Sequence, residues 1–304
     1  MIDRGGSDRS GRYEAVDIEV RGGSLRVGIW GPESSPPVLA IHGITASHLA
    51  WQLVAEALPD LRIIGPDLRG RGRSSELPGP YGFDQHADDL ARLIDQLGLG
   101  PVPIVGHSMG GFVAVAVAHR HPDLISGVLL LDGGLPFVIG PEVDLDQLVA
   151  STLGPALERL DLSFESVDAY RAFWRRHPAL TDAWGPALID YVDYDLIGDA
   201  PRLHSTVSAE AVRIDAREQF ATRVDDQVLA RLSRPMTMIT APRGLLGAPP
   251  GLYPTDVMHR WRALLPGLEV TELDGVNHYT MVMAAAGVAQ IAPRIADLAT
   301  AYDR

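Results

Sequence analysis

The chain has 304 residues, a formal net charge of −13 and 46% hydrophobic residues, so we expect a folded protein with a large buried core. The negative charge argues against nucleic-acid partners and against docking on an anionic membrane, because phosphate groups would repel it. The sequence contains no cysteine and no lysine, which excludes disulfides, thiol nucleophiles, thiolate metal sites and mechanisms that need a lysine.

The N-terminal region and the hydropathy pattern bear on location. Residues 1–12 are polar and glycine-rich, so we expect a tail rather than a signal peptide. No apolar stretch approaches the length that spans a bilayer. We therefore expect a cytoplasmic protein with no membrane partner. Nothing in the sequence indicates its oligomeric state.

Short apolar runs alternate with helical patterns in the first part of the chain. Segments 15–20 and 25–30, joined at "RGGS", predict an antiparallel pair of strands. Further strands are predicted at 36–43, 61–67, 102–108 and 127–134, and helices at 47–58, 84–97 and 109–120. This alternation predicts an α/β fold with a mostly parallel central sheet flanked by helices.

The pattern changes after Leu135. Residues 136–230 contain no clear strand but several helix-like segments and many aromatic side chains, which predicts a helical insertion. Strand–helix alternation then resumes, with strands at 234–242 and 268–278 and helices at 255–264 and 280–300. We therefore divide the chain into a polar tail (1–12), an α/β core (13–135 and 231–304) and the insertion.

A G-x-S-x-G motif, Gly106-His107-Ser108-Met109-Gly110, lies between a predicted strand and a predicted helix. A nucleophile on such a tight turn has a strained backbone, and flanking residues larger than glycine would collide with neighbouring strands. The turn lifts the serine hydroxyl clear of the sheet and puts the next amide at the positive end of a helix. Ser108 is therefore the predicted nucleophile.

With these features the chain resembles the α/β-hydrolase fold family, from about residue 14 to its end. "IHGITAS" is similar to the family's oxyanion segment, and "GPDLRGRGRSS" is similar to its stretch after the fourth strand, where Asp67 and Arg69 are expected to be structural. The resemblance implies that residues 136–230 form a cap, and it implies no cofactor. The backbone amides of Met109 and Ile44 are the candidate oxyanion donors.

A serine hydroxyl needs a base, and histidine is suited to that role near neutral pH. His278, in "LDGVNHYT", follows the last predicted strand and matches the position of the family's catalytic histidine. His107 is expected to line the pocket, and His42 to brace its loop. The histidines and carboxylates lack the spacing of a metal site, so no metal is expected.

The third member of the triad orients the histidine. Where the family commonly carries it, this chain has Arg243 and a Gly/Pro-rich loop, and the first carboxylate there is Asp256. A minority of the family, including haloalkane dehalogenases and zearalenone-type lactonases, carries the acid after the strand that precedes the cap. Asp132 lies there, so it is the preferred acid and Asp256 the alternative. Gly133 and Gly134 are assigned to the turn that follows.

These features predict a carboxylic ester hydrolase that forms an acyl-enzyme intermediate and accepts a small hydrophobic ester or a lactone. The same triad also serves C–C bond hydrolases and cofactor-free haloperoxidases, and some ligand receptors keep it, so these alternatives stay open. The residues expected to line the substrate pocket, besides His107, are Trp51, Leu135, Phe137, Trp174, Trp184 and Tyr279.

Overall fold

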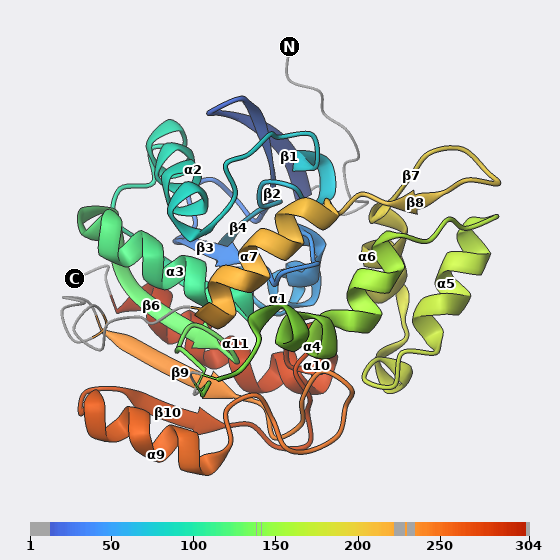
Figure 1. Cartoon of the computed structure of the whole chain (residues 1–304). Coiled ribbons are helices and arrows are strands. Elements are labelled where there is room, and N and C mark those ends of the chain that lie inside the picture. The colour runs from blue at the N-terminus through green and yellow to red at the C-terminus, as the bar shows by residue number, and fades with distance from the viewer. Residues whose placement is uncertain (1–12, 138, 141, 222–228, 230–234, 302–304) are drawn as a thin grey trace.

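A computed structural model of the chain describes residues 13–137, 139–140, 142–221, 229 and 235–301. The expected N-terminal tail and the predicted boundary at residues 230 and 231 lie outside this part. An eight-stranded sheet in the order β1-β2-β4-β3-β5-β6-β9-β10 forms the centre of the molecule (Figure 1). The pairs β1–β2 and β2–β4 are antiparallel and all other neighbours are parallel, which confirms the predicted α/β class.

The elements of the core lie close to their predicted positions. The strands of the sheet are β1 (Tyr13–Val20), β2 (Gly23–Trp30), β3 (Pro37–Ile41), β4 (Arg62–Pro66), β5 (Val102–His107), β6 (Ile125–Leu131), β9 (Met236–Thr240) and β10 (Glu269–Glu272). The helices of the core are α1 (Gln52–Ala57), α2 (Phe83–Gln96), α3 (Met109–Arg120), α9 (Thr255–Leu264), α10 (Thr280–Met283) and α11 (Ala285–Thr300), and 3-10 helices occur at His48–Trp51, Gly72–Ser74 and Pro122–Leu124.

The last predicted helix, over residues 280–300, is wrong in one respect because it is two helices. Ala284 separates α10 from α11 with an extended backbone, φ −134° and ψ 145°. The amides of Gly287 and Val288 both donate to the carbonyl of Ala284, so this residue closes the first turn of α11. An apolar, alanine-rich sequence carries no signal for such a break.

The sheet is buried on both faces because its side chains alternate between two cores. On β3, Leu39 and Ile41 belong to the core that contains α2, α3 and α9, whereas Val38 and Ala40 belong to the core that contains α1 and α11. The same alternation runs through β5, β6 and β9. A sheet covered on both faces needs strands that are apolar at every position, which is why these segments appear as continuous apolar runs.

The segment between β6 and β9 is mostly helical. It contains α4 (Leu145–Leu160), α5 (Val167–Arg175), a 3-10 helix (Thr181–Ala183), α6 (Pro186–Tyr194) and α7 (Ala209–Ala221). The expectation that it contains no strand is wrong, because β7 (Leu196–Ile197) and β8 (His204–Ser205) form a small antiparallel sheet. Two residues are too few to produce a periodic pattern. In Figure 1 this small sheet lies with α5 and α6 on the right of the molecule.

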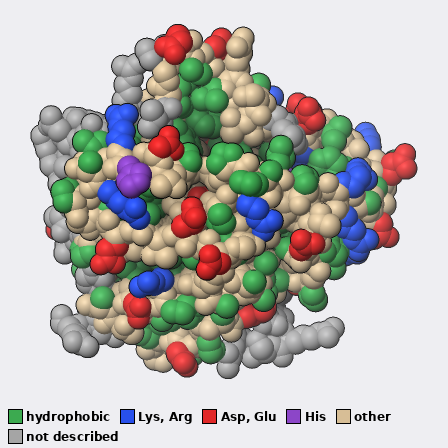
Figure 2. All heavy atoms as spheres, turned by 90° about the horizontal axis from the view of Figure 1, so that it is seen from below, with side chains coloured by type: hydrophobic (Ala, Val, Ile, Leu, Met, Phe, Trp, Pro, Cys, Tyr) green, Lys and Arg blue, Asp and Glu red, His purple; other side chains and the backbone are tan. Residues whose placement is uncertain are grey.

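No helix in the described ranges is both long and apolar enough to cross a membrane. Figure 2 shows one face of the molecule, on which acidic and basic side chains are interspersed rather than gathered by sign. This face therefore carries no patch of a single charge sign.

Candidate active site

Ser108 occupies the turn between β5 and α3, with a backbone φ of 57° and ψ of −124°. Such a conformation is strained for any residue with a side chain. A Cβ on Gly106 would lie 2.2 Å from the carbonyl oxygen of Gly110, and a Cβ on Gly110 would lie 2.2 Å from the carbonyl oxygen of Ile41. Both glycines of the motif are therefore required by the close approach of backbone segments around the serine.

Asp132 follows β6 and is the second strained residue. Ser108 and Asp132 are the two residues other than glycine that have positive φ values in the described part of the chain, and φ of Asp132 is 47°. The amide of Asp132 donates to the carbonyl of Ile239 at 2.8 Å, and its Oδ1 accepts from the amide of Ala241 at 3.2 Å. Asp132 is fully buried, and these two hydrogen bonds tie it to the end of β9 and to the residue that follows β9.

Gly133 lies between this carboxylate and the serine turn. A Cβ on Gly133 would lie 1.9 Å from the carbonyl oxygen of Ser108, so a glycine is required by backbone contact with the Ser108 turn, Gly106–Gly110, which we call the elbow. The turn predicted for Gly133 and Gly134 needs a left-handed backbone only at Gly134, because the φ of Gly133 lies outside that region. Gly134, with φ 103°, does have the conformation that a turn glycine supplies.

We expect Gly133→Ala to lower the free energy of unfolding by about 3 kcal/mol or more, because the added methyl group must displace backbone atoms. Gly267 is the matched control, since a Cβ there would meet no atom of the described part of the chain within 4 Å. Gly267→Ala is expected to change stability by less than about 0.5 kcal/mol. Urea denaturation of both variants measures the difference. Equal stability of the two variants would contradict the backbone contact.

His278 lies between β10 and α10, and its Nδ1 is 2.7 Å from Oδ2 of Asp132. Its amide donates to the carbonyl of Arg243 at 2.9 Å. The Arg243 side chain donates to the carbonyls of Gly275 and Val276, at 2.6 and 3.2 Å. Arg243 thus holds the loop that carries His278. It occupies the position at which α/β hydrolases commonly carry the acid of the triad.

Asp256, the alternative acid, lies apart from this pair. It is exposed in the first turn of α9, which begins after Pro254. An acidic residue there interacts favourably with the positive end of the helix. Of the two candidate acids, Asp132 is therefore the one that contacts His278.

His107 is buried beside the same histidine. Its Nε2 donates to the carbonyl oxygen of His278 at 2.8 Å, and the two rings are 4.7 Å apart between centroids. Burial, with a smaller contribution from the neighbouring His278, lowers the pKa of His107 well below its ordinary value. His107 is therefore neutral near pH 7 and acts as a donor that orients the loop, as well as lining the cavity.

Ile44 and Met109, the candidate oxyanion donors, belong to segments on either side of Ser108. Met109 is the first residue of α3, so its amide has no acceptor within the helix. The loop that contains Ile44 passes close to the nucleophile, because a Cβ on Gly43 would lie 3.2 Å from the Cβ of Ser108. Ile44 and Ser108 both line the same cavity.

His42 braces this loop from the buried side. Its Nδ1 donates to the carbonyl of Gly43 at 2.7 Å, and its Nε2 accepts from the amide of Leu68 at 3.0 Å. The bond that Nε2 accepts requires a neutral ring, because a protonated ring has no free acceptor nitrogen. Burial lowers the pKa of His42 to about 4, against the opposing effect of the Asp67 carboxylate.

This pKa predicts an acid-dependent loss of stability. The unfolded chain binds a proton at His42 below about pH 6.5, whereas the folded chain does so only near pH 4. Stability from this residue is therefore complete above pH 6.5 and declines by about 3 kcal/mol as the pH falls to 4. We expect the free energy of unfolding of His42→Asn to fall less over this range than that of the wild type. Parallel pH profiles of the two proteins would contradict the assignment.

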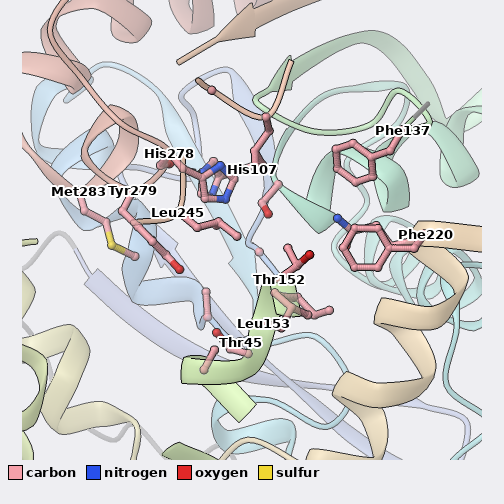
Figure 3. Close-up of a pocket in the computed structure, with 18 of the residues that line it drawn as sticks. Thr45, His107, Phe137, Thr152, Leu153, Phe220, Leu245, His278, Tyr279 and Met283 are labelled. Atoms are coloured by element: carbon pink, nitrogen blue, oxygen red, sulfur yellow. Dashed lines mark hydrogen bonds between the residues drawn. The ribbon is translucent and has the colours of Figure 1, made fainter. Parts of the chain in front are cut away.

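A cavity of about 410 Å³ opens next to Ser108, His107 and His278. Figure 3 shows Phe137 and Phe220 on one side of this cavity and Tyr279 and Met283 on the other, with His278 and His107 between them. Its wall is mostly apolar and comes from the core loops and from the insertion. The remaining lining residues are Gly43, Ile44, Thr45, Ala46, Ile139, Leu148, Thr152, Leu153, Ala156, Trp174, Leu180, Tyr191, Gln219, Leu245, Gly251, Leu252, Pro254 and Val257.

Four of the predicted pocket residues, His107, Phe137, Trp174 and Tyr279, line this cavity. The expectation for the other three is wrong. Trp51 is fully buried in the core, against Gly65 of the sheet. Leu135 is also fully buried, and its carbonyl accepts from the Tyr253 hydroxyl at 2.6 Å. Trp184 is half-buried on the insertion, where the Arg175 guanidinium stacks over its ring at 4.9 Å.

Sequence reasoning missed the part of the wall that α4 and α7 supply. On α4, Leu148, Thr152 and Ala156 line the cavity at intervals of four residues, which puts them on one helix face. On α7, Gln219 and Phe220 do so. The four-residue interval on α4 was a usable signal, but it does not distinguish a pocket wall from a core face.

Comparison with known proteins agrees with the fold. The family model of the α/β hydrolase fold matches residues 36–186, which include Ser108 and Asp132. The chain belongs to the α/β-hydrolase fold family. The resemblance stated from the sequence motifs is therefore confirmed.

Relatives of this α/β hydrolase among curated proteins match it in part. The lipase LipV of Mycobacterium tuberculosis is 43% identical over 108 residues, or 36% of this chain and 41% of that protein. A putative 2-succinyl-6-hydroxy-2,4-cyclohexadiene-1-carboxylate synthase of Bacillus subtilis is 32% identical over 158 residues, or 49% of this chain and 53% of that protein. The chain thus spans about half the length of these relatives or less.

Solved structures match this α/β hydrolase over nearly its whole length. A thioesterase domain from the curacin biosynthetic pathway has a TM-score of 0.75 at 23% identity, covering 93% of this chain and 99% of that one. E-2-(acetamidomethylene)succinate hydrolase has a TM-score of 0.74 at 22% identity, covering 94% and 98%. At this level of identity the likeness establishes the fold.

Proposed function

We propose that the chain is a serine hydrolase that cleaves carboxylic esters through an acyl-enzyme intermediate. The observation that carries the proposal is the contact of 2.7 Å between Asp132 and His278, because His278 lines the same cavity as Ser108. A nucleophile, a base and an orienting carboxylate are the groups that acyl transfer by a serine requires. The lipase among the relatives adds support for an ester as substrate.

The proposed mechanism follows from the hydrogen bond that one nitrogen of His278 already makes. Nδ1 of His278 is bound to Asp132, so Nε2 is the nitrogen available to take the proton of the Ser108 hydroxyl. Ser108 Oγ then attacks the ester carbonyl, and the amides of Ile44 and Met109 stabilise the resulting oxyanion. His278 returns the proton to the departing alcohol. A water molecule, activated by the same histidine, attacks the acyl-enzyme and releases the acid and the free serine.

The cavity supports a neutral, hydrophobic substrate of moderate size. Its volume of about 410 Å³ lies within the range of about 300–1,000 Å³ that is usual for small-molecule sites. The described residues that line it include no arginine, so a substrate carboxylate would lose water without gaining a cationic partner. Phe137 and Phe220 on one side and Tyr279 and Met283 on the other supply apolar surface for the acyl and alcohol groups. Lactones combine both groups in one ring and belong to the same proposal.

We also propose that residues 136–230 act as a cap that determines which ester is accepted. The support is the contribution of α4 and α7 to the cavity wall, through Leu148, Thr152, Ala156 and Phe220. Substrate selection by this segment is expected to vary with its side chains, while the core supplies the chemistry.

A panel of p-nitrophenyl esters from acetate to decanoate, together with unsubstituted lactones, tests the proposed function. The sharpest comparison within it is p-nitrophenyl butyrate against p-nitrophenyl hemisuccinate, which differ chiefly by one carboxylate. We expect kcat/KM for the butyrate to be about 100-fold higher or more, because the carboxylate would be buried without a partner. A folded wild type that hydrolyses no member of the panel would contradict an ester hydrolase. Equal rates on the pair would contradict the neutral pocket.

A further inference from the structure

Arg71 is a fully buried guanidinium that contacts both candidate oxyanion residues. Its Nε donates to the carbonyl of Ile44 at 2.9 Å, and its Nη2 lies 3.8 Å from Sδ of Met109. A third donor, Nη1, binds the carbonyl of Arg69 at 2.9 Å within the same loop. A single side chain thus touches the two segments that must hold their amides toward one oxygen atom.

The charge of Arg71 is balanced by an acid from the insertion. Oδ2 of Asp215, on α7, lies 2.5 Å from Nη1 of Arg71 and 2.9 Å from Nε2 of His86, and Oδ1 accepts from the amide of Gly82 at 2.7 Å. Burial alone would raise the pKa of Asp215, but the Arg71 guanidinium and the hydrogen bond with His86 hold this pKa below its ordinary value. Asp215 is therefore an ionised carboxylate that anchors α7 to Arg71.

We propose that Arg71 is a positioning residue that holds the oxyanion donors in place and does so fully only when α7 is docked through Asp215. The inference rests on the proposed function, because it concerns the oxyanion of acyl transfer. Arg71 does not line the cavity, so it acts through Ile44 and Met109 rather than on the substrate.

Arg71 acts on the oxyanion donors by fixing their positions, and not through its charge. Asp215 neutralises Arg71, so the pair adds little net field at the serine. The hydrogen bond from Arg71 to the Ile44 carbonyl fixes the peptide group between residues 44 and 45. Fixing this peptide group restricts the backbone of Ile44 and so orients the N–H of Ile44. Oxyanion donors stabilise charge only at about 2.7–3.1 Å from the oxygen, and a displacement of about 1 Å can cost about 100-fold in rate.

The test compares Arg71 with Arg69, which is equally buried in the same loop. The Arg69 side chain binds both oxygens of Asp89 at 2.8 and 2.9 Å and the carbonyls of Pro78 and Arg21 at 2.6 and 2.8 Å, and it contacts neither oxyanion residue. Lysine and glutamine are introduced at each of the two positions. The readouts are kcat and KM for p-nitrophenyl butyrate, the inhibition constant of butylboronic acid, whose serine adduct carries the oxyanion, and the Tm.

For Arg71→Lys and Arg71→Gln we expect kcat to fall about 10- to 100-fold, the boronate inhibition constant to rise by a similar factor, and KM to change by less than about threefold. The Arg69 variants are expected to lose Tm but to keep kcat and boronate binding within about threefold of the wild type. Asp215→Asn, which leaves Arg71 in place, is expected to reduce boronate affinity about 3- to 10-fold. This variant decides the question if the Arg71 variants do not fold.

The proposal is overturned if the folded Arg71 variants lose Tm alone, if the Arg69 variants lose as much kcat, or if Asp215→Asn binds the boronate as tightly as the wild type. A wild type that binds the boronate but hydrolyses no ester would contradict the ester hydrolase, while the boronate constants would still decide the role of Arg71. A wild type that does not bind the boronate would overturn both.

Discussion

Ser108→Ala is expected to lower kcat for p-nitrophenyl butyrate by about 10⁵- to 10⁶-fold. Without Oγ no acyl-enzyme can form, and the remaining oxyanion amides and the histidine provide only a small residual acceleration. Alanine keeps the Cβ and hence the same strained backbone at this turn, so the Tm is expected to stay close to that of the wild type. Steady-state kinetics and mass detection of an acyl or fluorophosphonate adduct measure the loss.

Ser126→Ala is the matched control for this substitution. Ser126 is buried on β6, and its Oγ has no hydrogen-bond partner among the described residues, so its removal leaves none of them unsatisfied. We expect this variant to keep wild-type kcat and to be labelled by a fluorophosphonate. Hydrolysis that survives in Ser108→Ala, with labelling retained, would assign the nucleophile to another residue and contradict the proposed mechanism.

The parts of the molecule that could be predicted from the sequence depend on local constraints. The elbow consists of five consecutive residues. Backbone contacts leave no room for a Cβ at Gly106 or Gly110, so the G-x-S-x-G motif indicates a tight strand-to-helix turn. The strands could be recognised because a sheet covered on both faces demands apolar residues at every position. The contact between Asp132 and His278 spans 146 residues, yet it was predictable because both follow strand ends at one edge of a parallel sheet.

The parts that could not be predicted depend on contacts between distant segments. Trp184 and Phe220 are both large aromatic residues of the insertion, and only the packing of the helices decides that Phe220 faces the cavity and Trp184 does not. Arg71 lies in an arginine-rich loop beside Arg69 and Arg73, and nothing in the local pattern separates it from them. Its distinguishing partner, Asp215, is 144 residues away.

A local sequence pattern can also indicate that a glycine is needed without giving the full physical reason, as at Gly133. Gly133 follows Asp132 at the end of a strand, where turn glycines are common, and a turn was the simplest interpretation. Its requirement comes instead from the carbonyl of Ser108, which belongs to a neighbouring strand-to-helix turn. Ser108 is thus in backbone contact with the residue that directly follows Asp132.

Asp132→Asn is expected to lower kcat by about 10⁴-fold, whereas Asp256→Asn is expected to change it by less than about twofold. Asparagine is the informative substitution because it adopts a positive φ readily, as the φ of 47° at this position requires, and it can still accept the Ala241 amide. Its amide nitrogen would donate to Nδ1 of His278 and so favour the tautomer that cannot take the Ser108 proton. The fold is therefore expected to survive while the base is lost.

Asp132→Asn and Asp256→Asn distinguish the two candidate acids, because each substitution removes one negative charge and keeps the shape of the side chain. Asp256 is exposed on α9, so its variant controls for the change in net charge. If Asp256→Asn lost most of kcat and Asp132→Asn kept it, the contact of 2.7 Å would be structural and the loop after β9 would supply the acid. If instead only Asp132→Asn is inactive, the acid follows the strand before the insertion, and Arg243 is free to hold the His278 loop because no carboxylate is needed in its place.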